Sequence, residues 1–229
     1  MILWLYSKHK RKSYVRCKNR RRIVKRIPNS RRIILVENFE QKKRNRPIKI
    51  TDIAISKVPK IELSEFSEKE NLFVQEQHKR ILSISKEKND SKEVGILVDI
   101  IHWYAWVILG EANEIETRSN PDAYKAMKGS RKNSMMFMHN HPSTGTFSGT
   151  DFKTFCLNDS LYIMTVVGND GNVRALTKLD GFDGGEALAY YSRLATQKYK
   201  DYQNNGTMAM RDLLKHSADI KIKYEIGGR

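Results

Sequence analysis

The segment that decides the fold is residues 134–151, SMMFMHNHPSTGTFSGTD, where an apolar run ends on two histidines. The apolar part predicts a buried strand over residues 134–139. Pro142 cannot continue a paired central strand, so the histidines are expected where the sheet ends and a loop begins. Because alternate residues of a strand face the same side, His139 and His141 are expected to converge on one point.

A carboxylate follows the histidines at a spacing that suits the start of a helix. Ser148 lies three residues before Asp151, which places Asp151 in the first helical turn, directed back at the loop. Two imidazoles and one carboxylate suit Zn²⁺ and leave a fourth position for water. Taken singly, Ser148 and Asp151 are more typical of helix capping. The combination with His139 and His141 therefore carries the prediction of one Zn²⁺ per chain.

Further strands and helices are expected on both sides of this segment. The predicted strands are residues 93–100, 103–109, 134–139, 162–168 and 172–177, the last two joined by a turn at Asn169-Asp170-Gly171. The predicted helices are residues 64–89 with Ser64 as N-cap, 120–129, 151–157, 186–202 and 207–217. This pattern predicts an α/β (α+β) domain with a central mixed β-sheet flanked by helices, preceded by a basic N-terminal extension.

The net charge of +16 is concentrated in the N-terminal part of the chain. Residues 1–50 contain 18 Lys and Arg but only two acids, whereas the remaining 179 residues contain 24 of each. We therefore divide the chain into a basic segment, residues 1–61, and a domain, residues 62–229. Ile33-Ile34-Leu35-Val36 within the segment is a short candidate strand.

Residues 8–46 of the basic segment could bind nucleic acid non-specifically through phosphate contacts and counterion release. The candidate residues are Arg20, Arg21, Arg22, Lys25 and Arg26. A disordered, solvated tail explains the same run of charge, and no zinc-finger or homeodomain pattern is present. Both interpretations stay open at the level of sequence.

Composition also bears on the cellular setting. No apolar run approaches the roughly 18 residues that a membrane span needs, and the first six apolar residues precede the basic ones, the reverse of a secretory signal. Cys17 and Cys156 are too few for a disulfide framework, and Cys156 is expected to be a small buried residue. We expect a cytoplasmic protein without membrane contact.

Together, His-Asn-His-Pro-Ser at 139–143 and Ser-x-x-Asp at 148–151 resemble the JAMM (MPN-plus) metalloprotease superfamily, most closely its bacterial RadC-like JAB domain branch. The resemblance covers residues 62 to about 180. It implies the JAMM/cytidine-deaminase-like layer architecture and a zinc-dependent peptidase or isopeptidase acting on a peptide or protein. It also implies His139, His141 and Asp151 as zinc ligands, with Ser148 donating a hydrogen bond to the developing oxyanion.

The same resemblance implies a glutamate general base at the start of a strand, followed by glycine and alternating apolar residues. Glu93-Val94-Gly95 fits, but many relatives have the glycine three residues after the glutamate rather than two. Alignment on Gly95 would place Lys92 at the catalytic position, and a slip of one residue reverses the facing of a strand side chain. Glu93 is preferred to three later glutamates, Glu111, Glu114 and Glu116.

A second function remains open from the sequence. A RadC-like domain could serve as a nucleic-acid-associated module with little or no hydrolase activity, since a fold does not determine an activity. The basic segment favours this alternative, whereas the intact set of metal ligands favours the hydrolase. Substrate identity and oligomeric state do not follow from the sequence.

Overall fold

The computed structural model describes residues 48–228, apart from residues 113 and 144–145. At its centre lies one six-stranded sheet in the order β2-β1-β3-β4-β5-β6. Within it, β3 and β4 pair in parallel and the other neighbours pair antiparallel. The strands are β1 (Val94–Asp99), β2 (Tyr104–Leu109), β3 (Met135–His141), β4 (Leu161–Gly168), β5 (Val173–Lys178) and β6 (Ile222–Ile226). The expected mixed sheet is thus confirmed.

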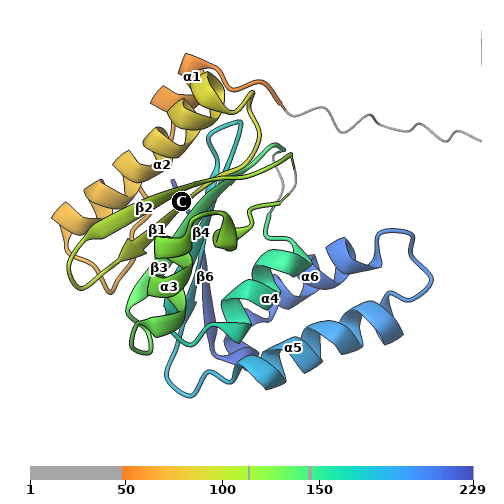
Figure 1. Ribbon diagram of the computed structural model, residues 1–229. Helices are drawn as coiled ribbons and strands as arrows, with labels where there is room; N and C mark the ends of the chain where they lie inside the picture. The colour runs from red at the N-terminus through yellow and green to blue at the C-terminus, as the bar shows by residue number, and fades with distance from the viewer. Residues whose placement is uncertain (1–47, 113, 144–145, 229) are drawn as a thin grey trace, which may run out of the picture. The chain divides into compact units, whose positions relative to one another are not determined.

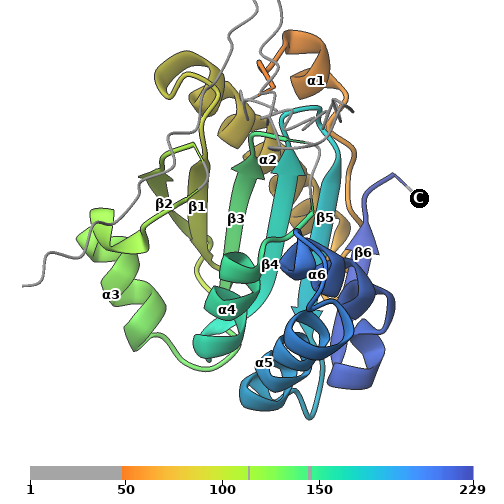
Figure 2. The same cartoon turned by 90° about the vertical axis from the view of Figure 1, so that its right-hand side faces the viewer.

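Helices cover both faces of the sheet (Figures 1 and 2). One face carries α2 (Glu68–Lys88), with the short α1 (Asp52–Ser56) beside it. The other face carries α3 (Pro121–Gly129), α4 (Gly149–Leu157), α5 (Gly184–Arg193) and α6 (Asn205–Lys215). None of the helices in the described part of the chain combines the length and apolarity needed to cross a bilayer.

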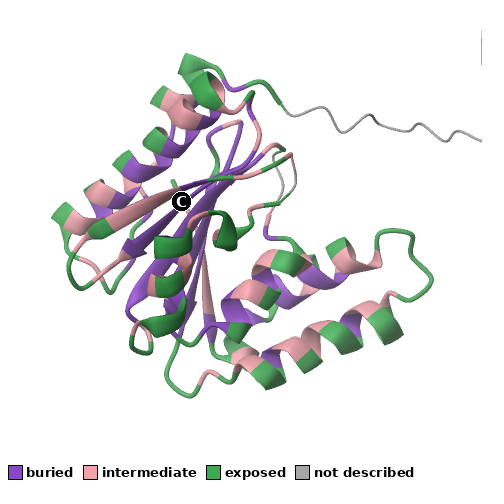
Figure 3. Cartoon of the chain, in the orientation of Figure 1, coloured by how far each residue is buried: buried purple, intermediate pink, exposed green. Residues whose placement is uncertain are grey.

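Strand β3 separates two apolar cores by the alternation of its side chains. Met136 and Met138 belong to the core under α2, whereas Met135 and Phe137 belong to the core under the other helices. Every residue of β3 is buried, as the purple strands of Figure 3 show. The histidines of β3 continue the series of Met135 and Phe137 and therefore face the α4 side.

Residues before the predicted domain take part in the fold. Ile50, Val58 and Ile61 are buried in the core under α2. Composition placed the end of the basic segment at residue 61, but the described residues from 48 onward pack with the domain. A change in charge density marks where lysine and arginine become sparse, and that point need not coincide with the first buried side chain.

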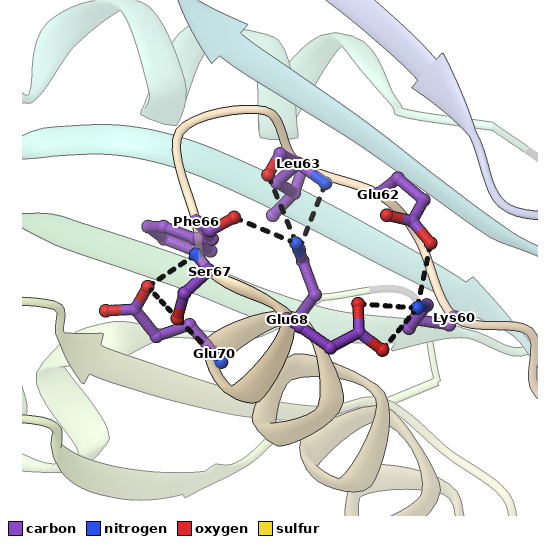
Figure 4. Close-up of polar contacts among 8 residues, drawn as sticks. Lys60, Glu62, Leu63, Phe66, Ser67, Glu68 and Glu70 are labelled. Atoms are coloured by element: carbon purple, nitrogen blue, oxygen red, sulfur yellow. Dashed lines mark hydrogen bonds and ion pairs between the residues drawn. The ribbon is translucent and has the colours of Figure 1, made fainter.

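The predicted start of the long helix was wrong by one turn. Ser67, not Ser64, is the N-cap: its hydroxyl accepts from the Glu70 backbone N–H, and Glu70 accepts from the Ser67 backbone N–H at 2.7 Å (Figure 4). The residues before this capping box bend back so that Leu63 is buried. Only Ser67 has a glutamate three residues later, which is the signal of a capping box.

The C-terminal part also differs from the expectation. The predicted helix over residues 186–202 ends as an α-helix at Arg193 and continues as a π-helical turn, Leu194–Lys198. The short strand β6 was missed, because five residues beside a terminal helix carry little periodic signal. The predicted hairpin is present, and Gly171 at its turn has a φ of 89°, with no room for a Cβ beside the Ala54 carbonyl oxygen.

Candidate metal centre and cleft

Strand β3 places two imidazoles at its end, on one face of the sheet. His139 is 1% exposed and His141 is 8% exposed. The ring of His139 stacks on Phe137 with centroids 5.4 Å apart. Gly95 of β1 pairs with His139, and a Cβ at this glycine would collide with the Phe137 ring at 2.9 Å. The glycine therefore makes room for the ring that orients the first histidine.

The start of helix α4 supplies the carboxylate. Ser148 is the N-cap: its backbone N–H donates to Asp151 Oδ2 at 2.6 Å, and its Oγ accepts from the Asp151 backbone N–H at 3.1 Å. This capping box turns the Asp151 side chain back toward the preceding loop. The helix-cap role of Ser148 is thus present, and it is the means by which Asp151 meets the histidines.

The three side chains converge on one point. Nε2 of His139 and Nε2 of His141 are 3.1 Å apart. Asp151 Oδ1 lies 3.3 Å from His139 Nε2, and Oδ2 lies 3.1 Å from His141 Nε2. Tetrahedral zinc with bonds of roughly 2.0–2.1 Å separates its ligand atoms by about 3.3 Å. The donor set and its spacing therefore fit a metal ion, and this group of residues could bind one.

The charges of the three groups depend on one another. Burial alone would raise the pKa of Asp151, but the neighbouring imidazoles, His139 first, hold it well below its usual range. Burial lowers the pKa of His139, which keeps this ring neutral. Burial also opposes the charge on His141, yet Asp151 and then Glu93 raise its pKa. An ionised carboxylate beside a neutral imidazole is the protonation state that a metal ligand set requires.

Glu93 lies at this centre, just before β1. It is 6% exposed and lines the same cleft as His141 and Ser148. By strand alternation it shares a face with Gly95, the residue paired with His139. Burial raises the pKa of Glu93 to about 7, with His141 acting in the opposite direction and Asp151 adding to the rise.

The other residues considered for the general base lie elsewhere. Lys92 pairs with Glu111 at 2.8 Å on the surface. Glu114 and Glu116 are exposed in the segment after β2, although the charge of Glu114 contributes to the raised pKa of Glu93. The structure therefore brings Glu93, and not Lys92, to the metal centre.

Asn140, between the two histidines, points to the opposite face and is fully buried. Its Oδ1 accepts from the Val94 backbone N–H at 2.7 Å, and its Nδ2 donates to the Lys92 carbonyl at 3.2 Å. The Nδ2 group also donates to Asn169 Oδ1 at 2.7 Å. Asn140 thus holds the backbone on both sides of Glu93.

A cleft of about 930 Å³ adjoins the metal centre. Glu93, His141 and Ser148 line it together with residues of α6, β5 and β6, and α6 packs beside α4 on this face of the sheet (Figure 2). Arg174, Arg211 and Lys215 are among its lining residues. These three residues could not be recognised from the sequence, because the pattern of a helix or strand does not show which neighbour its charged side chains meet.

Several predicted features lie outside the described residues. They are the candidate strand 33–36, Cys17 and the nucleic-acid candidates Arg20, Arg21, Arg22, Lys25 and Arg26. Cys156 is described, and it is buried in the core as expected.

Comparisons with known protein families, curated proteins and solved structures found no match.

Proposed function

We propose that this protein is a zinc-dependent hydrolase of peptide or isopeptide bonds, similar to the RadC-like branch of the JAMM superfamily, with one Zn²⁺ per chain. The observation that carries the proposal is the convergence of His139, His141 and Asp151 beside a buried glutamate in a cleft. Two imidazoles, one carboxylate and an open side suit catalytic rather than structural zinc.

The bound ion would polarise the scissile carbonyl and lower the pKa of water. Burial raises the pKa of Glu93 to about 7 in the metal-free protein, and a buried carboxyl beside the metal site is suited to act as a general base. In the proposed reaction it takes a proton from the attacking water and returns it to the leaving amine. Burial of its carboxyl excludes most solvent from this transfer.

Ser148 suits the stabilisation of negative charge on the substrate oxygen. Its Oγ accepts a hydrogen bond from the Asp151 N–H, which leaves its own hydroxyl hydrogen to be donated toward the cleft. A donor that is already positioned in the ground state needs no reorganisation during the reaction.

Zinc content tests the ligand set. The purified protein is expected to contain about one zinc per chain by inductively coupled plasma mass spectrometry. His141→Ala should lose most of it, since the substitution removes one of three protein ligands. His102→Ala is the matched control, because His102 is exposed and, among the described residues, forms an ion pair with Asp99 alone. Equal zinc content in both variants would contradict the assignment.

Hydrolysis is tested on a mixture of natural peptides read by mass spectrometry. The zinc-loaded protein should generate new peptide termini, and Glu93→Gln should reduce their formation at least about a hundredfold while retaining zinc. Full cleavage by Glu93→Gln would move the general base to another residue. Absence of cleavage by the zinc-loaded protein would leave the nucleic-acid-associated module as the better proposal.

A further inference from the structure

Two cations of α6 line the cleft and contact none of the described residues through an ion pair or hydrogen bond. Arg211 and Lys215 are four residues apart, one helical turn, and both are exposed. Within the described part of the chain, neither side chain has an ion pair or a hydrogen bond. Arg174 of β5 adds a third positive charge to the lining.

The acidic residues of the cleft do not pair with Arg211 or Lys215. Asp212 is engaged by Lys198 at 2.8 Å and by Tyr199 at 3.2 Å. Glu93 is buried, with 6% of its surface exposed. Since residues 51–229 contain equal numbers of basic and acidic residues, the positive lining is a local feature. It favours a negatively charged occupant.

Apolar and aromatic side chains share the cleft with the cations. Met208 and Leu214 of α6 line it together with Phe147, Tyr199 and Tyr224. A volume of about 930 Å³ lies within the range of pockets that enclose ligands of several hundred daltons. Nucleic-acid sites use longer tracks of cations, because each neutralised phosphate contributes separately. Mixed apolar and cationic walls suit an extended peptide with apolar and acidic side chains.

We propose that this cleft binds an acidic peptide, with Arg211 and Lys215 facing carboxylates of the bound chain next to the metal centre. Cleavage of the bound peptide rests on the proposed hydrolase function. The cleft then assigns acidic peptides as the class of substrate.

Binding is measured by fluorescence anisotropy with zinc-loaded, full-length Glu93→Gln protein, so that no peptide is consumed. The probes are a fluorescein-labelled peptide alternating glutamate and leucine, the same peptide with glutamine for glutamate, and a thymidine oligonucleotide of matched charge. The glutamate peptide should bind more tightly than the glutamine peptide. The double variant Arg211→Gln, Lys215→Gln should weaken binding of the glutamate peptide about fivefold, as expected for two partly exposed charge pairs.

The control is Lys125→Gln with Arg131→Gln, which removes the same charges from exposed positions outside the cleft. This control also holds constant any binding by the basic N-terminal segment. Equal losses in both double variants, or equal binding of the two peptides, would overturn the proposal. A loss confined to the oligonucleotide would overturn it in favour of a phosphate-binding cleft. Zinc content is measured separately, so failure of the metal site is distinguishable from failure of the peptide site.

Discussion

Asn140 stands between the two histidines, yet it acts on the other side of the sheet. Its amide bonds the backbone of Lys92 and Val94, the neighbours of Glu93, and it connects to Asn169 and Ser85. Because one residue of β3 fixes the segment that contains Glu93, the spacing between the glutamate and the histidines is set by a buried amide network. A buried network of this kind is costly to leave partly unsatisfied.

We predict that Asn140→Ala disturbs Glu93 without removing the metal ligands. The change leaves the Val94 N–H and the Lys92 carbonyl without their amide partner, at a cost of about 1–3 kcal/mol in unfolding free energy. In the metal-free protein, the Glu93 carboxyl should titrate near pH 7, and in Asn140→Ala its pKa should fall toward the ordinary value as the segment loosens and admits water. Carbon-detected NMR of labelled glutamate measures both values.

Ser85→Ala is the control for Asn140. It removes the bonds of the Ser85 hydroxyl to the Lys92 carbonyl and to Asn140 Nδ2 but keeps the bond from the Val94 N–H to Asn140. Stability should fall while the pKa of Glu93 stays near 7. An unchanged pKa in Asn140→Ala would show that the network does not position the glutamate. The pKa of Glu93 is higher in the folded protein than in the unfolded chain. Protonated Glu93 therefore contributes fully to the stability of the metal-free protein at pH values below the pKa of the unfolded chain. This contribution is lost as pH rises through about 7.

At the scale of elements, the first turn of helix α4 combines a helix cap with a carboxylate beside the two histidines. The capping box between Ser148 and Asp151 begins the helix, and the same geometry directs the Asp151 carboxylate to the histidines. A helix cap and a candidate metal ligand therefore share one element boundary. The hydroxyl of Ser148 caps the helix, and its proposed second role is to donate a hydrogen bond to the oxyanion.

Two substitutions at Ser148 separate these two roles. Ser148→Ala should cost about 1 kcal/mol of stability because alanine is a poor N-cap, whereas Ser148→Gly should cost only a few tenths. Both remove the hydroxyl hydrogen. We expect both to reduce hydrolysis by a similar factor, about a hundredfold, whereas thermal unfolding distinguishes them. Activity that followed stability, with Ser148→Gly nearly fully active, would leave Ser148 as a cap alone.

At the scale of the whole molecule, the basic segment precedes a domain whose described part starts next to the metal centre. The Ile48 backbone N–H donates to the Pro142 carbonyl at 2.7 Å, and the Ile48 carbonyl accepts from Asn169 Nδ2 at 2.7 Å. Pro142 directly follows His141.

We predict that nucleic-acid binding by this protein requires residues 1–45 and weakens steeply as the salt concentration rises. Electrophoretic mobility shifts compare the full chain with a chain that begins at Arg46, because a start near residue 60 would remove the buried Ile50 and Val58. The full chain should bind DNA of any sequence and release it as salt rises, by counterion release. The shorter chain, checked for folding by circular dichroism, should bind much more weakly. Equal binding by both chains would exclude this role.

The sequence by itself determined the local features of this protein. Two histidines at alternate positions of a strand, the Ser-x-x-Asp helix start and the Asn-Asp-Gly hairpin turn each depend on residues that are near neighbours in the chain. Their side chains share a face or a turn whatever surrounds them. The mixed sheet flanked by helices could be predicted for the same reason, since it follows from the alternation of short periodic segments.

Tertiary structure decided what depends on neighbours distant in sequence. The choice of Glu93 over Lys92 depends on the pairing of β1 with β3, and the role of Asn140 depends on the segments packed against it. The cationic lining of the cleft exists only because α6 lies beside the metal centre. Spacing along the chain orients a side chain within one element, but only the packing of elements determines which group it meets.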